Sequence, residues 1–332
     1  MAIETKEEDD SEVRQRSQIQ QFWRQYRQNT LSIIGGLIIV AMVLIALGAP
    51  FIAPQDPYQQ FDPPQDQFHP VSPGTTVYTD QTGDARTEVT AYLGTDNVGR
   101  DILSRIIYGT RTTLLVAFSV VTFALLIGAV LGAVSGYYRN SVIDDVIMRF
   151  MDVIFPFPSL VLAIALLGVV GVGTTEYTLP LLGNLSVPNL AKVIIVISIV
   201  YIPRFARVMR GAVLKEVEED YVDALKALGA SDSRIILKDI VINTIPSVIV
   251  QATLYMGTAI LISAGLSFLG LGIQPPTASL GVMLSSSRNY IYSGEWWFSV
   301  FPGVMIMITI LGFNLLGDGL RDALDPRYQG NE

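Results

Sequence analysis

The sequence predicts an all-α polytopic membrane protein with about six transmembrane helices. Half of its 332 residues are hydrophobic and only 16% are charged, whereas a soluble domain carries about 25% charged residues. The stretch 240–287 contains no Asp, Glu, Lys or Arg. A soluble protein cannot solvate such a stretch, but the hydrocarbon core of a bilayer accepts it.

Charge-free apolar runs mark the individual helices. A transmembrane helix needs about 20 apolar residues. Besides the five runs of this length given below, one further candidate run, 193–203, is shorter than 20 residues and is bounded by Lys192 and Arg204. Because both long side chains can reach the membrane interfaces, we expect a span there over about 190–207. The runs that reach the full length are 31–52, 114–138, 153–173, 246–271 and 296–317.

The distribution of positive charge predicts the orientation of these spans. With six spans, one side of the membrane receives 16 of the 22 Lys and Arg residues. Such an excess marks the cytoplasmic side. We therefore expect the N- and C-termini to be cytoplasmic. The segments placed inside by this arrangement are 1–30, 139–152, 204–239 and 318–332.

Composition excludes several classes of function. The chain has no cysteine, which excludes disulfides and thiolate metal sites. Its net charge of −8 argues against nucleic acid as a partner, because phosphate binding needs a basic surface. The one histidine, His69, lies among prolines, and we expect a solvated loop residue rather than a metal ligand. No phosphate-binding loop of the form G-x-x-x-x-G-K-[ST] is present, so we expect no ATP hydrolysis by this chain.

The second span carries Gly128, Gly132 and Gly136 at intervals of four residues. Small residues at this spacing allow two helices to approach closely. The spacing fits either ordinary packing against another helix or a specific dimerisation face.

The first outer segment, 53–113, is rich in Pro, Gln, Asp and Gly, which predicts loop structure with little core of its own. Near its end, over 101–108, we expect a short interfacial helix that lies on the outer face of the membrane. The helix would carry a narrow apolar stripe at helical spacing, formed by Ile102, Leu103, Ile106 and Ile107.

The inner segment 204–239 contains a short amphipathic helix. Basic residues come first, and an acidic patch over 216–220 follows. Gly229 ends the helix, since glycine accepts the left-handed conformation of a C-cap. The apolar residues that recur at helical spacing before it are Tyr221, Val222, Ala224, Leu225 and Leu228.

Three roles are open to such a helix. A helix resting on lipid headgroups should have a lysine-rich polar face, but acidic residues dominate this one. A simple connector needs no apolar face. The third role, a docking surface for a partner protein, is the one that the residues favour.

Three blocks of this sequence resemble one family of transporter subunits. The stretch 218–243, EEDYVDALKALGASDSRIILKDIVIN, resembles the EAA loop of ABC importer permeases. The stretches 93–113, LGTDNVGRDILSRIIYGTRTT, and 314–327, NLLGDGLRDALDPR, are similar to parts of the dipeptide, oligopeptide and nickel permeases of the C-subunit type. Two positions depart from the family pattern: Asp223-Ala224-Leu225 replaces the usual Glu-Ala-Ala, and Ile242 replaces a proline.

The resemblance implies the type I ABC importer permease fold in the cell membrane. It also implies partners: a homologous second permease subunit, two ATPase subunits that bind ATP and Mg²⁺, and an extracytoplasmic substrate-binding protein. The chain itself would hold no cofactor or metal and would not be an enzyme. Its implied task is inward translocation of di- or oligopeptides, or related small solutes, by alternating access.

The predicted permease core is 114–317, between an N-terminal tail, 1–30, and a C-terminal tail, 318–332. No predicted span has an Asp or Glu at its centre, which disfavours an intramembrane aspartate protease and an ion-coupled carrier. Neutral polar groups mark a possible translocation path at Gln251, Ser263 and Asn314. The coupling residues implied by the resemblance are Tyr221, Val222, Asp223, Ala224, Leu225, Leu228, Gly229 and Ala230.

Overall fold

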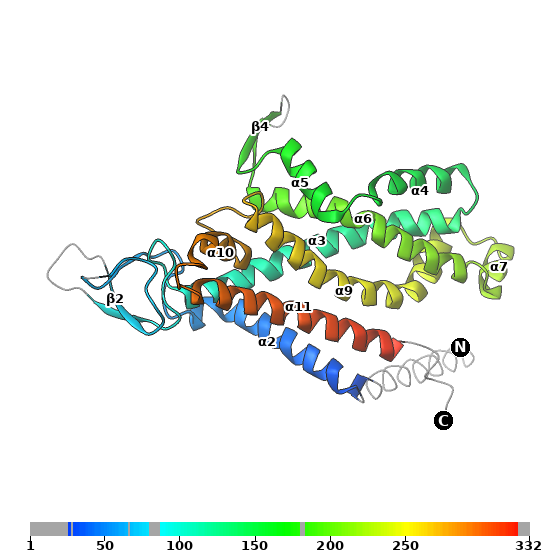
Figure 1. Ribbon diagram of the computed structural model, residues 1–332. Coiled ribbons are helices and arrows are strands. Elements are labelled where there is room, and N and C mark those ends of the chain that lie inside the picture. Colours follow the sequence, from blue (N-terminus) through cyan, green and yellow to red (C-terminus); the bar gives the residue numbers. More distant parts are fainter. Residues whose placement is uncertain (1–25, 28, 66, 80–86, 180–182, 325–332) are drawn as a thin grey trace.

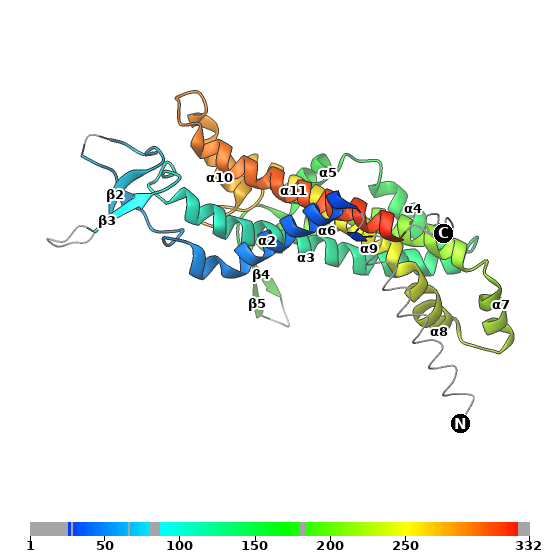
Figure 2. The same cartoon turned by 90° about the horizontal axis from the view of Figure 1, so that it is seen from below.

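The computed structural model describes residues 26–27, 29–65, 67–79, 87–179 and 183–324 (Figure 1). Within these residues, five helices are long and apolar enough to cross a membrane, and one bent pair of shorter helices could supply a sixth crossing. The helices form an elongated bundle with a small β-sheet at one end and the short helix α7 at the other (Figures 1 and 2). We call these the sheet end and the α7 end.

The bounds of the elements are as follows. The long helices are α2 (Thr30–Ile52), α3 (Ile102–Tyr137), α6 (Asn189–Glu216), α9 (Val241–Phe268) and α11 (Trp297–Leu324). The shorter helices are α4 (Val142–Ile154), α5 (Ser159–Val170), α7 (Asp220–Ala227), α8 (Asp232–Arg234), η1 (Ile235–Ile240), α10 (Leu280–Ser287) and η2 (Arg288–Tyr290). The strands are β1 (Phe61–Asp62), β2 (Thr75–Thr79), β3 (Glu88–Ala91), β4 (Thr175–Leu179) and β5 (Gly183–Val187).

The first and last long helices meet at the α7 end (Figure 1). There the side chain of Asn29, which caps α2, donates a hydrogen bond to Asp322 of α11 at 3.0 Å. Ser32 is fully buried where α2 meets Gly319. The described chain thus enters and leaves the bundle at the same end, an arrangement that fits an even number of crossings with the bent pair as the sixth.

The predicted single span at 153–173 was wrong. The structure has α4 and α5 there instead, bent by 92° relative to each other. The break falls at Phe155-Pro156-Phe157-Pro158, where two prolines remove amide donors and disfavour helical geometry in the residues before them. The apolar helix that remains, α5, has 12 residues and is about 18 Å long.

The weakest predicted span is instead a long and well-buried helix. In α6, 67% of the most apolar window is buried, against at most 39% in the other four candidate spans. The helix continues to Glu216, so Arg204 lies inside it rather than at its end.

The predicted interfacial helix over 101–108 was also wrong as a separate element. These residues form the beginning of α3, which starts at Ile102 and runs without a break to Tyr137. Asp101 caps the helix by accepting hydrogen bonds from the Ser104 amide and hydroxyl at 2.8 and 2.7 Å. Three of the four side chains of the stripe are buried against the rest of the chain, with Ile102 at 0% and Ile106 at 4% exposure, and Leu103 is partly exposed.

The outer segment has more structure than its composition indicates. Strands β1, β2 and β3 form an antiparallel sheet in that order, with Val77 opposite Val89. A small core lies beside it, made of Phe61, Val71, Val77 and Ala91. A second hairpin, β4–β5, was not predicted.

The loop histidine is part of this folded segment. His69 Nδ1 lies 2.8 Å from Thr95 Oγ1, and Nε2 lies 2.7 Å from the carbonyl oxygen of Phe61. A carbonyl can only accept, so Nε2 carries the proton. Within the described part of the chain, no group of three or more His, Cys, Asp or Glu residues could hold a metal ion.

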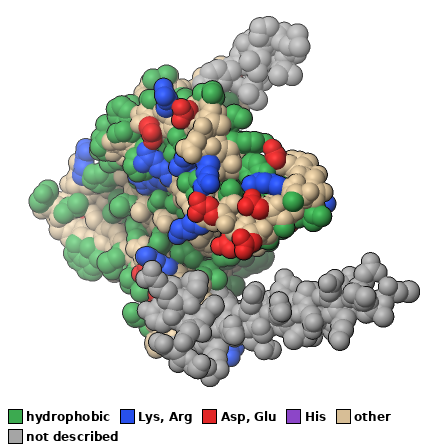
Figure 3. All heavy atoms as spheres, turned by 90° about the vertical axis from the view of Figure 1, so that its right-hand side faces the viewer, with side chains coloured by type: hydrophobic (Ala, Val, Ile, Leu, Met, Phe, Trp, Pro, Cys, Tyr) green, Lys and Arg blue, Asp and Glu red, His purple; other side chains and the backbone are tan. Residues whose placement is uncertain are grey.

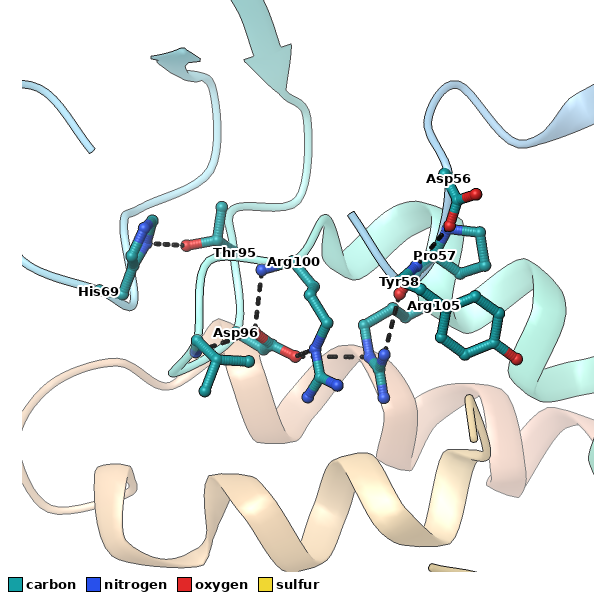
Figure 4. A network of polar contacts seen from close by, with 9 residues as sticks. Asp56, Pro57, Tyr58, His69, Thr95, Asp96, Arg100 and Arg105 are labelled. Carbon is teal, nitrogen blue, oxygen red and sulfur yellow. Dashed lines mark hydrogen bonds and ion pairs between the residues drawn. The ribbon is translucent and has the colours of Figure 1, made fainter. Parts of the chain in front are cut away.

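Buried charges fix the sheet end to α3 (Figure 4). Asp96 accepts hydrogen bonds from the Arg100 amide at 2.9 Å and from Arg100 Nε at 2.7 Å. Arg105 is 1% exposed, lies 3.4 Å from Asp96, and donates to the carbonyl of Pro57 at 2.9 Å. These contacts join the segment after α2 to the first turns of α3.

Close contact between α3 and α6 forms the centre of the bundle. A Cβ on Gly128 would lie 2.6 Å from Phe205 Cβ, and one on Gly132 would lie 2.3 Å from the Ala206 carbonyl oxygen. Gly136 faces Val213 in the same way. The glycines therefore pack against α6 of the same chain, so this face is not free for dimerisation.

We predict that Gly132→Leu lowers the thermal unfolding midpoint of the purified chain in detergent. The larger side chain must push α3 away from α6, and overpacking of this kind costs about 1–3 kcal/mol. Gly168→Leu is the matched control, because Gly168 of α5 has no atom within 4 Å of its Cβ position. Equal midpoints for both variants and the unsubstituted chain would contradict the packing account.

Candidate functional site

The short helix α7 has a well-defined end. Gly229 has a φ of +76°, the left-handed conformation that favours glycine. Its amide donates to the Lys226 carbonyl at 3.0 Å, and the Ala230 amide donates to the Leu225 carbonyl at 3.1 Å. These two hydrogen bonds make a Schellman motif, which satisfies carbonyls that the helix end leaves open. The predicted role of Gly229 as a helix terminator is confirmed.

A polar cluster joins α7 to two long helices. The Tyr221 hydroxyl donates to Glu216 Oε1 at 2.7 Å, and Asn243 Nδ2 donates to the same oxygen at 2.7 Å. Glu216 ends α6 and Asn243 lies in the first turn of α9, so three helices meet at one carboxylate. Burial raises the pKa of Tyr221 to about 12, and the hydrogen bond to Glu216 acts in the same direction. The hydroxyl therefore remains a neutral donor at neutral pH.

A second set of contacts ties the loop around α7 to the end of α3. Asp232 accepts hydrogen bonds from the hydroxyls of Tyr137 and Tyr138, both at 2.8 Å. Arg139 pairs with Glu218 at 2.6 Å on the other side of α7. Val222 is fully buried beneath the helix. The position of α7 is therefore determined by α3, α6 and α9 together.

Further along α6, arginines hold the bent pair. Arg210 makes two hydrogen bonds to the carboxylate of Asp144 at 2.8 and 2.9 Å and one to Ser135 of α3 at 3.1 Å. Arg207 pairs with Asp152 at 2.5 Å, and its guanidinium lies 3.6 Å from the centre of the Phe155 ring. Both ends of α4 are thus attached to α6.

The structure divides the eight predicted coupling residues into two groups. Val222 is buried, and three others are partly buried and pack against the core: Tyr221, Leu225 and Ala230. The other four are exposed: Asp223, Ala224, Leu228 and Gly229. Leu228 is 84% exposed. Acidic and basic side chains gather on this end face of the molecule (Figure 3).

The three residues of the predicted translocation path do not come together. Ser263 is 4% exposed. Asn314 of α11 lies beside Gly257, where its Oδ1 would be 3.1 Å from an added Cβ. Gln251 interacts with Tyr255, one turn further along α9. A helix turns by about 100° per residue, so Gln251 and Tyr255 lie on one face of α9. Gly257, the neighbour of Asn314, lies on a different face.

Arg204 belongs beside Gln251 in this region, and sequence reasoning missed it. The sequence predicts the arginine as the boundary of a short span, because apolar residues stop there. The signal that could have placed it was the recurrence of arginine at 204, 207 and 210. Spacing of three on a continuous helix puts all three on one side, where each meets α4 or α5.

The bundle of long helices, with the short helix α7 between α6 and α9, is a fold found among solved membrane transporters. This fold is shared with the methionine ABC transporter in inward-facing conformations, with a TM-score of 0.51 at 19% identity over 67% of this chain and 97% of that one. Residues 124–330 match the family described as binding-protein-dependent transport system inner membrane component. Residues 17–70 match the N-terminal transmembrane domain of oligopeptide transport permease C.

Similar proteins cover nearly the whole chain. The di/tripeptide transport system permease of Pseudomonas aeruginosa is 39% identical over 94% of this chain and 93% of its own length. The dipeptide transport system permease of Alkalihalophilus pseudofirmus is 40% identical over 92% and 89%. A glutathione transport system permease of Escherichia coli is 36% identical over 93% and 91%.

This chain belongs to the family of binding-protein-dependent transport system inner membrane components. It is a multi-pass membrane protein and a transmembrane permease subunit of an ABC importer, and its family is one of transport permeases rather than enzymes.

Proposed function

We propose that α7 is the helix through which an ATPase subunit drives this permease. The observation that carries the proposal is the combination of exposed residues, among them Ala224 and Leu228, with an underside where Val222 is buried and Leu225 packs on the core. Small Ala224 allows a partner to approach closely, and exposed Leu228 offers it apolar surface. A helix anchored by α3, α6 and α9 transmits a push, whereas a loosely attached connector would absorb it.

The partners follow from this assignment. Two ATPase subunits bind ATP and Mg²⁺, and one of them grips α7. A homologous second permease completes the path across the membrane, and a substrate-binding protein delivers cargo at the sheet end. The folded segment there supports the last point, because its buried Asp96 and Arg105 hold it rigidly on α3.

The α7 end is cytoplasmic in this proposal. The positive-inside distribution supports it, since 16 of the 22 Lys and Arg residues belong to segments predicted to lie inside. Both termini and the segment 204–239 then face the ATPases.

Di- and oligopeptides are the proposed cargo. Relatives named for di- and tripeptide transport are 39% and for dipeptide transport 40% identical to this chain, and a relative named for glutathione, itself a peptide, is 36% identical. The pore would alternate between outward-facing and inward-facing states as the ATPases open and close.

The orientation can be tested by thiol labelling, because the chain has no native cysteine. Ser72 and Ser231 are both exposed, at the sheet end and the α7 end. We expect an impermeant maleimide to label Ser72→Cys in intact cells and Ser231→Cys only after the membrane is permeabilised. Labelling of Ser231→Cys alone from outside would reverse the orientation.

Coupling can be tested at Ala224, whose side chain is exposed on α7. Ala224→Arg should leave the fold intact, reduce ATPase affinity by about tenfold or more, and abolish transport, because the bulky cation prevents close approach. Ala224→Ser keeps the size and should behave as the unsubstituted chain. Asp223→Asn should be mild, since among the described residues Asp223 pairs only with Lys226, on an exposed surface.

The measurements are co-purification of the ATPase and substrate-stimulated ATP hydrolysis by the assembled complex. If Ala224→Arg co-purifies with its ATPase and supports transport at the unsubstituted rate, α7 is only a connector and the coupling assignment is wrong.

A further inference from the structure

Arg204 places a cation about halfway along the membrane-spanning helices. Its neighbour Phe205 packs on Gly128, near the centre of the charge-free run 112–138 of α3. The guanidinium lies 5.7 Å from the ring of Tyr255, which is at the midpoint of α9. Two independent helices therefore give the same depth for this side chain.

Polar and aromatic side chains from three helices surround the guanidinium. It stacks on Tyr201 at 4.9 Å and donates a hydrogen bond to Ser159 at the start of α5. The Tyr201 hydroxyl donates to Thr258 at 2.9 Å, and Gln251 interacts with Tyr255. Thr258 is exposed, while Gln251 and Tyr255 are partly exposed. A strip of this chemistry does not suit contact with lipid tails.

The charge of Arg204 has no acidic partner among the described residues. The next two arginines of the helix both have one, because Arg207 pairs with Asp152 and Arg210 with Asp144. A guanidinium has five N–H donors, and within the described chain only the hydrogen bond to Ser159 uses one of them. Arg204 is partly exposed, so its remaining donors are accessible.

Physical chemistry limits what such a group can face. A charged side chain at membrane depth is costly unless it faces a water-filled path or a partner of opposite charge. Cation–π contacts with the two tyrosine rings use none of the N–H donors of the guanidinium, so the donors that do not bind Ser159 remain available. Paired donors in one plane match a carboxylate, which they bind in a bidentate manner.

We propose that Arg204 binds the carboxylate of the substrate as it passes through the translocation path, with Tyr201 and Tyr255 holding the guanidinium in place. The inference rests on the proposed import of peptides, each of which carries a carboxylate at its C-terminus. It assigns the recognition of that carboxylate to this chain in addition to the binding protein.

The test uses the full complex with its binding protein in proteoliposomes and two probes, dialanine and dialanine C-terminal amide. Arg204→Gln removes the charge, and Arg204→Lys keeps it. Arg111→Gln is the matched control, because Arg111 is an exposed arginine of α3. Comparing each variant with the unsubstituted complex for the same probe cancels the selectivity of the binding protein.

We expect Arg204→Gln to reduce initial dialanine uptake by about tenfold, as the loss of a charge-assisted pair of hydrogen bonds requires. Uptake of the amide should change by less than about twofold. Arg204→Lys should retain most dialanine uptake, and Arg111→Gln should retain all of it. If the binding protein does not deliver the amide, the test is whether Arg204→Lys retains the dialanine uptake that Arg204→Gln loses.

Three results would overturn the inference alone while the unsubstituted complex imports dialanine. Uptake by Arg204→Gln could be unchanged, or it could fall equally for both probes. Failure of Arg204→Gln to co-purify with the second permease would show instead that the arginine pairs with a carboxylate of that subunit. If the unsubstituted complex imports no dialanine, the proposed peptide cargo fails and the inference fails with it.

Discussion

The close approach of α3 to α6 is the constraint on which the rest of this structure depends. Glycines at 128, 132 and 136 let the two backbones touch, which leaves no room for lipid between them. The contact buries one side of α6 and directs its arginines toward α4 and α5. The bent pair of α4 and α5, whose apolar part is short, is thereby held by ion pairs with α6 and by packing against it.

The same contact explains how a short helix at one end can affect the middle of the membrane. Glu216, at the end of α6, receives hydrogen bonds from both Tyr221 of α7 and Asn243 of α9. Movement of α7 therefore acts on two helices that also carry Arg204 and Tyr255, the groups that meet at mid-depth. Coupling in this account needs no long chain of separate contacts, because two rigid helices connect the sites.

Local signals were sufficient for much of the fold. Gly229 predicted the end of α7, and the charge-free runs predicted five of the six crossings, because bilayer thickness and helical geometry leave few alternatives. The predictions failed where neighbours decide. The arginine at 204 ended an apolar run but did not end the helix, because Phe205 beside it packs on Gly128 and the guanidinium contacts neutral side chains of α5 and α9. Val222 belonged to the predicted docking face but lies beneath α7, since periodicity alone does not say which apolar side faces inward.

The central claim is that α7 is anchored to the ends of α3, α6 and α9 and moves with them as one body. Val142 reports the position of the end of α3, because Asp144 beside it accepts a hydrogen bond from Ser135 of α3. Spin labels at Val142→Cys and Ala227→Cys test the claim directly, because both positions are exposed and the chain has no other cysteine. Double electron–electron resonance on the assembled complex should give one narrow distance distribution with the same mean in the nucleotide-free and ATP-bound states. A mean distance that shifts between the two states, or a distribution that broadens on ATP binding, would show that α7 moves independently and would contradict the account.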